Sequence, residues 1–429
     1  MKRFRAGELA CVAAGVLLTF MSSFGQNFFV AVFGGELRKS FDLSNGQFGA
    51  LYMCVTIVSA AVFVWAGRLV DHYPLRLVAV STVLGLMAAS LLLGSSNGPL
   101  TLALALFGLR LFGQGMSPHI SATAVTRWVD SRSRGRALAV AMIGNPIGEA
   151  TLPLLAVAAM AEVGWRNIWF AVAVTLAVIF LPALLAFSRS MRRVSATAVD
   201  RSPVRPGHNR TNAEARPSRT AAQMIRDPLF YLLLPGLVTP IFINTSVFFH
   251  QVALCQAKGW SPAWFVASYP FSSAMNICST LLAGWLLDRV GTRPVLAVLL
   301  LPQLLALLAL ATSDRAMIIP LYLALAGATM GTVQPVQSTV LAEIYGTGHF
   351  GEVRAVVTSS NVLMGALGPA LIGLLIDRGV TFEQASFGMA LYTLMAISLL
   401  FVAIVMMKRA VSNVALAGLT VDSTSHRVG

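Results

Sequence analysis

Twelve apolar runs follow one another along the chain, each close to the length of a membrane-spanning helix, and this succession limits the folds open to it. Inside lipid a backbone must satisfy its own hydrogen bonds, so such runs predict helices. The short alternating strands of a membrane barrel are not present. We therefore expect an all-α membrane protein with spans near 9–31, 47–67, 77–95, 100–124, 137–160, 168–188, 229–251, 265–286, 295–312, 317–342, 356–376 and 386–407.

Basic residues are distributed unevenly among the loops between these runs. Of the 31 lysines and arginines, six fall in loops on one side of the predicted membrane and one lies inside a span, which leaves 24 on the side of the N-terminus. Because cytoplasmic loops retain lysine and arginine, this bias predicts a multi-pass protein of the cell inner membrane with both termini in the cytoplasm. It also accounts for the net charge of +14 without a nucleic-acid partner.

One long polar interruption divides the spans into two sets of six. Ser188–Asp227 is rich in Arg, Ser, Thr, Pro and Ala and has few large apolar residues, so we expect a disordered linker. The predicted organisation is an N-terminal six-helix bundle at 1–188, a cytoplasmic linker at 189–227, a C-terminal six-helix bundle at 228–408 and a cytoplasmic tail at 409–429.

The two sets of spans repeat each other at a constant offset of 217 residues. Matches at one offset, each at an equivalent place in a span, indicate a duplication and two pseudo-symmetric halves. Two parallel six-helix repeats are a known transporter architecture. The matched pairs are Gly67/Gly284, Asp71/Asp288, Arg76/Arg293, Asn27/Asn244, Phe48/Phe265, Tyr52/Tyr269, Pro118/Pro335 and Ser121/Ser338.

One loop motif occurs after the second span and again after the eighth. The first copy reads GRLVDHYPLR from Gly67, and the second reads GWLLDRVGTR from Gly284. Both resemble the G-x-x-x-D-R-x-G-R-R/K signature of the major facilitator superfamily, although His72 and Pro74 depart from it in the first copy. Helix number, linker and repeat extend the resemblance over the whole chain. It implies that superfamily's twelve-helix fold, alternating-access transport of a small-molecule substrate, and a monomer in the lipid bilayer.

The resemblance also implies that these two loops form a gate on the cytoplasmic side. Glycine lets helix ends approach closely, and an aspartate there accepts hydrogen bonds from free N–H groups of a neighbouring helix or pairs with arginine. Such a latch would hold the cytoplasmic side shut; the alternative is that the aspartates only end helices and set topology. The predicted gate residues are Gly67, Asp71, Arg76, Gly284, Asp288, Arg289 and Arg293.

Two opposite charges lie deep in predicted spans of the first half. Arg110 stands in the fourth span, and Glu149, in the fifth, is the only acidic residue deep in any span. A charge at that depth is costly unless it faces protein or water, so we expect the two to meet. They form either a static ion pair or a pair that opens when Glu149 takes a proton or Arg110 takes the substrate. The second alternative makes Glu149 and Arg110 the proton-coupling residues.

In the superfamily the first, fourth, seventh and tenth helices line a central cavity. Polar side chains of those spans are therefore the predicted substrate-binding residues: Asn27, Arg110, Gln114, Asn244, Gln334 and Gln337. The four cysteines lie in apolar runs without metal-binding spacing, so we expect neither a metal nor a cofactor. The sequence has no catalytic grouping, and an enzyme is not expected.

The sequence leaves the solute open among three classes. Amides and aromatic residues along the predicted cavity favour proton-coupled uptake of a vitamin-like heterocycle such as riboflavin. Resemblance to bacterial carriers of oxalate, formate and monocarboxylates gives the alternative of an organic-anion permease. A proton-driven exporter of drugs or metabolites would share the fold. Since Arg354 stands at a predicted helix start, Arg110 is expected to be the only deep cation, which disfavours a small dianion.

Overall fold

The computed structural model describes residues 6–129, 133–186, 219–346 and 348–425, with the backbone alone for 409–425. These residues form helices and short connections, and no strand occurs among them. The calls for residues 189–218 of the linker and for 426–429 of the tail lie outside the described residues. The domain boundaries drawn from the sequence therefore stay predictions.

The N-terminal half consists of helices joined by short turns. They are α1 (Ala6–Ser22), η1 (Ser23–Gly25), α2 (Asn27–Val30), η2 (Ala31–Phe33), α3 (Gly34–Phe41), α4 (Asn45–Ala66), α5 (Leu69–His72), α6 (Leu75–Gly94), α7 (Pro99–Gly108), η3 (Leu109–Met116), α8 (Ser117–Trp128), α9 (Arg134–Met142), α10 (Gly144–Thr175) and η4 (Leu176–Phe180).

The C-terminal half follows the same plan. Its helices are α12 (Ala221–Ile225), α13 (Pro228–Phe249), α14 (Gln251–Ala257), α15 (Pro262–Ala267), α16 (Tyr269–Val290), α17 (Thr292–Val298), α18 (Leu301–Thr312), α19 (Ile318–Tyr345), α20 (Phe350–Asp377) and α21 (Phe382–Ser425).

The helices account for the twelve predicted spans. Within the described ranges, 10 segments are long and apolar enough to cross a membrane. One of them, Arg134–Ala186, covers 53 residues and contains a break at Gly164, where φ is 74°, so it corresponds to the fifth and sixth predicted spans. The eighth predicted span corresponds to α16, a 22-residue helix outside those 10. The chain is thus an all-α membrane protein built of two six-helix bundles.

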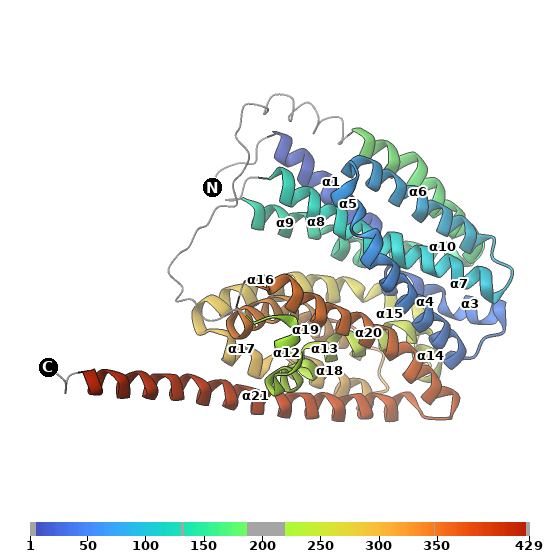
Figure 1. The fold of residues 1–429 in the computed structure, drawn as a ribbon. Coiled ribbons are helices and arrows are strands. Elements are labelled where there is room, and N and C mark those ends of the chain that lie inside the picture. The colour runs from blue at the N-terminus through green and yellow to red at the C-terminus, as the bar shows by residue number, and fades with distance from the viewer. Residues whose placement is uncertain (1–5, 130–132, 187–218, 347, 426–429) are drawn as a thin grey trace, which may run out of the picture.

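The two bundles touch at one end and diverge toward the other (Figure 1). The closed end carries α3, α14 and α15 and the last turn of α20, and we call it the Asp377 end. The opposite end carries α5 and the loops with the repeated motif, and we call it the Asp71 end. Contacts between the halves come mainly from α4 against α20 and from α10 against α16.

The Asp377 carboxylate ties the two halves together at the closed end. It accepts hydrogen bonds from Ser44 Oγ at 2.6 Å, from the Asn45 backbone N–H at 3.1 Å and from the Gly46 backbone N–H at 2.7 Å. These groups belong to the first turn of α4, whose backbone N–H groups have no partners within their own helix. Nearby, a Cβ at Gly373 would overlap the backbone of α4. The first turn of α4 and the last turns of α20 are therefore in direct contact at this end.

The last part of the predicted linker is folded, so the prediction of disorder is wrong there. Thr220 and Gln223 form a capping box that starts α12, and Met224 is completely buried against the C-terminal half. Arg219 also pairs with Asp227 at 2.8 Å. The prediction used the average composition of the whole segment, which is polar. It therefore missed the short helix α12, whose Met224 side chain packs on the C-terminal half. In the predicted tail, the backbone of α21 continues as helix as far as Ser425.

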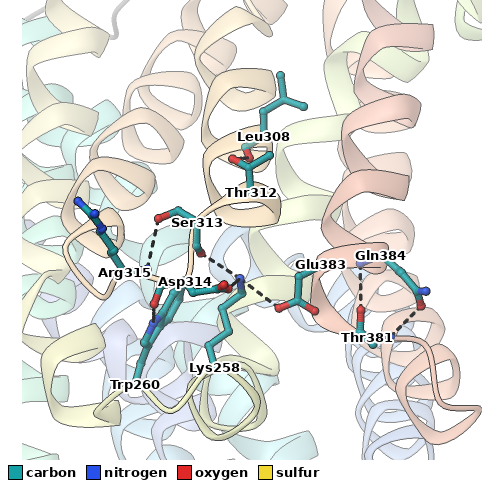
Figure 2. Close-up of polar contacts among 10 residues, drawn as sticks. All are labelled: Lys258, Trp260, Leu308, Thr312, Ser313, Asp314, Arg315, Thr381, Glu383 and Gln384. Atoms are coloured by element: carbon teal, nitrogen blue, oxygen red, sulfur yellow. Dashed lines mark hydrogen bonds and ion pairs between the residues drawn. The ribbon is translucent and has the colours of Figure 1, made fainter.

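A buried lysine joins two loops and the first turn of α21 at the Asp377 end of the C-terminal half. The Lys258 side chain is 1% exposed, and its Nζ lies 3.1 Å from both Asp314 and Glu383 and donates to the Ser313 carbonyl at 3.0 Å. Figure 2 shows the ammonium group between the two carboxylates, with Trp260 beside it. The cluster fixes the loops before α15 and α19 relative to the first turn of α21.

Replacing Lys258 by glutamine is expected to lower the apparent melting temperature in detergent by about 3–5 °C, because a buried charged donor is lost. The same change at Lys39, an exposed lysine of α3, should leave the melting temperature unchanged. Differential scanning fluorimetry of both purified variants checks this. Equal melting curves for the two would show that the Lys258 cluster does not stabilise these loops.

Candidate substrate cavity

A cavity of about 390 Å³ lies between the two halves. Four of the six predicted substrate-binding residues line it: Arg110, Gln114, Gln334 and Gln337. They come from η3 of the first half and α19 of the second. The structure adds three polar residues from α20, Arg354, Thr358 and Asn361, that were not predicted.

Arg110 is held in place by a tyrosine and by an unusual helical turn. Its Nη1 donates to the Tyr52 hydroxyl at 2.8 Å, and its guanidinium lies 5.0 Å from the centre of the Tyr52 ring. Arg110 and Gln114 both stand on the π-helical stretch η3, a widened turn that recurs at functional sites. The charge is thus aimed into the cavity by a completely buried neighbour.

The backbone of η3 packs directly on that of the first span. A Cβ on Gly25 would stand only 2.8 Å from Gly113 Cα, so both glycines are required for this approach. The first span is interrupted here, since Gln26 has extended backbone angles (φ −80°, ψ 154°) between η1 and α2. The contact fixes Arg110 relative to Asn27 within the first half.

Arg354 is a second cation in the cavity that was not among the predicted site residues. It lies on the second turn of α20, and its side chain lines the same cavity. The sequence-based expectation treated a helix start as membrane surface. Because the halves diverge toward the Asp71 end, the first turns of α20 face the space between them instead. The cavity therefore has one guanidinium from each half.

The cavity opens toward the Asp71 end through a vestibule of about 800 Å³. Phe63, Arg354 and Thr358 line both spaces, so they are continuous. The vestibule is also lined by His119 and Asp71. Among the described residues that line the inner cavity, none is acidic.

Asn27 and Asn244 lie in a separate polar chamber of about 160 Å³ beside the cavity. The Asn27 amide donates to the Thr245 carbonyl at 3.1 Å, and Asn244 donates to the Pro240 carbonyl and to Gln303 Oε1. Both side chains thus join helices in addition to lining the chamber. Gln114 lines the chamber as well as the cavity and stands between them.

The expected ion pair between Arg110 and Glu149 is not formed. Glu149 lies in the small chamber, where its Oε1 accepts a hydrogen bond from Ser272 Oγ at 2.9 Å. Arg110 points into the cavity and bonds Tyr52. Arg110 therefore lies in the main cavity and Glu149 in the smaller chamber, and each side chain is hydrogen-bonded to a hydroxyl group. Depth alone, which is what the sequence gives, does not determine which side chains meet.

The predicted gate residues do not bridge the halves in this structure. Asp71 pairs with Arg127 of its own half at 2.8 Å, and the Gly67 carbonyl lies 3.1 Å from His119 Nε2. Apart from the backbone of its own helix, no described residue lies within 4 Å of where a Cβ at Gly284 would stand, so another helix does not approach it closely in this structure. The latch stays a prediction for a state in which this end is closed.

The other gate residues have local contacts or lie open. The Arg289 guanidinium lies 4.8 Å from the centre of the Trp285 ring, and Arg293 donates to the Met407 carbonyl at 3.3 Å. Asp288 is exposed, and Arg76 is half-buried at the start of α6. None of these contacts reaches the other half.

If the cavity opens at the Asp71 end, a cysteine at Thr358 is expected to react with a membrane-impermeant maleimide added on that side. A cysteine at Thr393, which is completely buried, should not react. Both are made with Cys54 and Cys278 changed to serine, because those two native thiols are exposed. Labelling of inside-out and right-side-out vesicles measures the side of access. Reaction of Thr358→Cys from the opposite side alone would contradict the assigned opening.

Comparison with known proteins supports the same fold. The family model of the Major Facilitator Superfamily matches residues 15–369 and 271–421. The chain is 24% identical over 382 residues to YcxA of Bacillus subtilis (strain 168), described as an uncharacterized MFS-type transporter, covering 84% of this chain and 88% of that protein. It is 24% identical over 396 residues to the phosphoglycerate transporter protein of Salmonella typhimurium (strain LT2), covering 88% and 84%.

Solved structures agree with these sequence matches. A bacterial homolog of the human lysosomal transporter Spinster, inward-facing and unoccupied, has a TM-score of 0.69 at 14% identity over 94% of this chain and 98% of that one. Its occupied form also has a TM-score of 0.69, at 15% identity over 92% and 96%. The chain belongs to the Major Facilitator Superfamily of membrane transporters.

Proposed function

We propose that the chain is a proton-coupled secondary transporter that takes up a small organic anion by alternating access. The observation that carries the proposal is the pair of guanidinium groups, Arg110 and Arg354, which come from opposite halves and line one cavity. No acidic side chain is among the cavity's described lining residues to neutralise them. A carboxylate or phosphate of the solute would supply the missing negative charge.

The remaining lining residues suit the same class of solute. Gln334, Gln337, Thr358 and Asn361 offer amide and hydroxyl donors around the two arginines. Such groups bond the oxygens of an anion without adding charge. The similarity to a phosphoglycerate transporter protein supports an anionic organic solute, as does the sequence resemblance to monocarboxylate carriers.

A vitamin-like heterocycle such as riboflavin, favoured by the sequence, has less support. A flat ring system is bound largely by stacking on aromatic side chains. Among the described lining residues of the main cavity, Phe63 is the only aromatic one. Phe28 and Phe248, which flank Asn27 and Asn244, line the smaller chamber instead.

The proposal places the protein in the inner membrane with both termini in the cytoplasm. On that topology the open Asp71 end faces the cytoplasm and the closed Asp377 end faces outward. Glu149 is proposed as the coupling residue, since it is a buried carboxylate at the interface of the halves that makes no ion pair with Arg110. Asp71, Asp288 and their neighbouring arginines are proposed to latch the cytoplasmic end when it closes.

Uptake of the transported anion is expected to fall about 10-fold or more in Arg110→Gln and Arg354→Gln, because each change removes a charge-assisted hydrogen bond. Arg315→Gln, which changes an exposed arginine at the Asp377 end, should transport normally. Proteoliposomes with an imposed pH gradient are screened over monocarboxylates, dicarboxylates, phosphorylated acids and riboflavin. Uptake of riboflavin that both cavity variants leave intact would instead establish the heterocycle function.

Uptake driven by a pH gradient is expected to be lost in Glu149→Gln, whereas exchange of solute across the membrane should persist. The amide keeps the shape of the side chain but does not bind or release a proton as a carboxylate does. Glu162→Gln, an exposed acid on the same helix, is the matched control. Full gradient-driven uptake by Glu149→Gln would remove this residue from the coupling mechanism.

A further inference from the structure

The carboxylate of Glu149 is held by a hydroxyl group from the opposite half. Ser272 of α16 donates to Glu149 of α10 at 2.9 Å, and the two residues are 5% and 8% exposed. Other polar contacts between the halves include the amide of Asn27 with the Thr245 carbonyl and the rim contact of Asp377. The Ser272–Glu149 bond is the one among these that joins a buried carboxylate to the other half.

Both partners of this bond occupy fixed positions within their own halves. Gly148, next to Glu149, packs so closely on Ser23 that a Cβ would overlap its side chain. The Ser272 carbonyl packs against Gly327 of α19 in the same way. Because each backbone is packed tightly against its own half, Ser272 and Glu149 move with their own halves. Movement of α10 away from α16 must therefore break the bond.

The surroundings of Glu149 leave it with neutral polar neighbours. Six amide side chains line its chamber: Gln26, Asn27, Gln114, Asn145, Asn244 and Asn276. The titratable group that interacts electrostatically with it is the Tyr269 hydroxyl on α16, which itself bonds Gln251. Arg110, the predicted partner of Glu149, bonds Tyr52 in the adjoining cavity. The hydroxyl of Ser272 is thus the donor that recognises the charge of Glu149.

We propose that Ser272 is a positioning residue for coupling, which links the protonation of Glu149 to the contact between α10 and α16. An ionised carboxylate accepts a hydrogen bond more strongly than a neutral one, so proton binding weakens the contact. Linkage is reciprocal, so closing the contact favours release of the proton into the space open at the Asp71 end. The inference rests on the proposed function, because it deepens the coupling role given to Glu149.

The separation of α10 and α16 determines how readily Glu149 binds a proton. When α10 and α16 are apart, Glu149 lacks its donor and holds a proton more readily. When they meet, the proton is released on the other side. Proton binding and the position of the halves then depend on each other, which is the requirement for coupled transport. Asp377 also titrates, but it is exposed at the rim and bonds backbone groups of α4.

The test measures the balance between the two states without any solute. The Thr358→Cys reporter is labelled with a membrane-impermeant maleimide between pH 5.5 and 8, and its rate is divided by that of Tyr73→Cys. Tyr73 is 53% exposed at the same end, which corrects for the pH dependence of the thiol itself. The normalised rate is expected to fall about fivefold from pH 8 to pH 5.5. Protonation of Glu149 removes one charge-assisted hydrogen bond, and a loss of that size changes the balance between the two states by about this factor.

Four single variants and one double variant in the reporter background distinguish the outcomes. Ser272→Ala and Glu149→Gln should each abolish the pH dependence, and the double variant should match the single ones. Ser273→Ala should keep it, because the Ser273 hydroxyl is also buried but has no hydrogen-bond partner among the residues that the structure describes. Asp377→Asn should change the balance at every pH while keeping its pH dependence.

The results separate this inference from the proposed function. A pH dependence that survives Ser272→Ala but not Glu149→Gln overturns the role of Ser272 and keeps that of Glu149. The inference itself is overturned if the normalised labelling rate does not change with pH. It is also overturned if the pH dependence is the same in Ser272→Ala and Glu149→Gln as in the parent protein. Solute uptake in proteoliposomes tests the organic-anion function independently of either result.

Discussion

The hydrogen bonds from the first turn of α4 to Asp377 join the two halves at the closed end. The two helices run in opposite directions, so the last turn of α20 lies beside the start of α4 at this end. Helices are stiff, and two bundles that are joined at one end separate at the other. The cavity, its vestibule and the inward orientation of Arg354 all depend on this geometry.

Much of the architecture was accessible from the sequence because lipid restricts the choice so strongly. Span length and loop motif identified the twelve-helix bundle pair, and the break at Gly164 coincides with the gap predicted between the fifth and sixth spans. Short local features were missed. The helix α12 is anchored by one methionine, and the π-helical turn of η3 has no clear signature in the residue pattern.

The candidate site was predicted less completely, for a physical reason. Residue type and depth identified Arg110, Gln114, Gln334 and Gln337, which do line one cavity. Which charges meet depends on helix rotation and on the angle between the halves. The sequence therefore suggested a pair between Arg110 and Glu149, whereas each has a hydroxyl partner. Arg354 and Ser272 were overlooked because one lies near a helix end and the other is a common residue in membrane helices.

The contact between Gly25 and Gly113 has a mechanical consequence. It makes the backbone that carries Arg110 one rigid body with the first span, so a rocking motion cannot move this arginine relative to its own half. Arg354 moves with the other half. The distance between the two guanidinium groups is then a direct measure of the angle between the bundles. An anion short enough to touch both would draw the bundles together, and a longer one would hold them apart, so the length of the solute would select which of them can be carried.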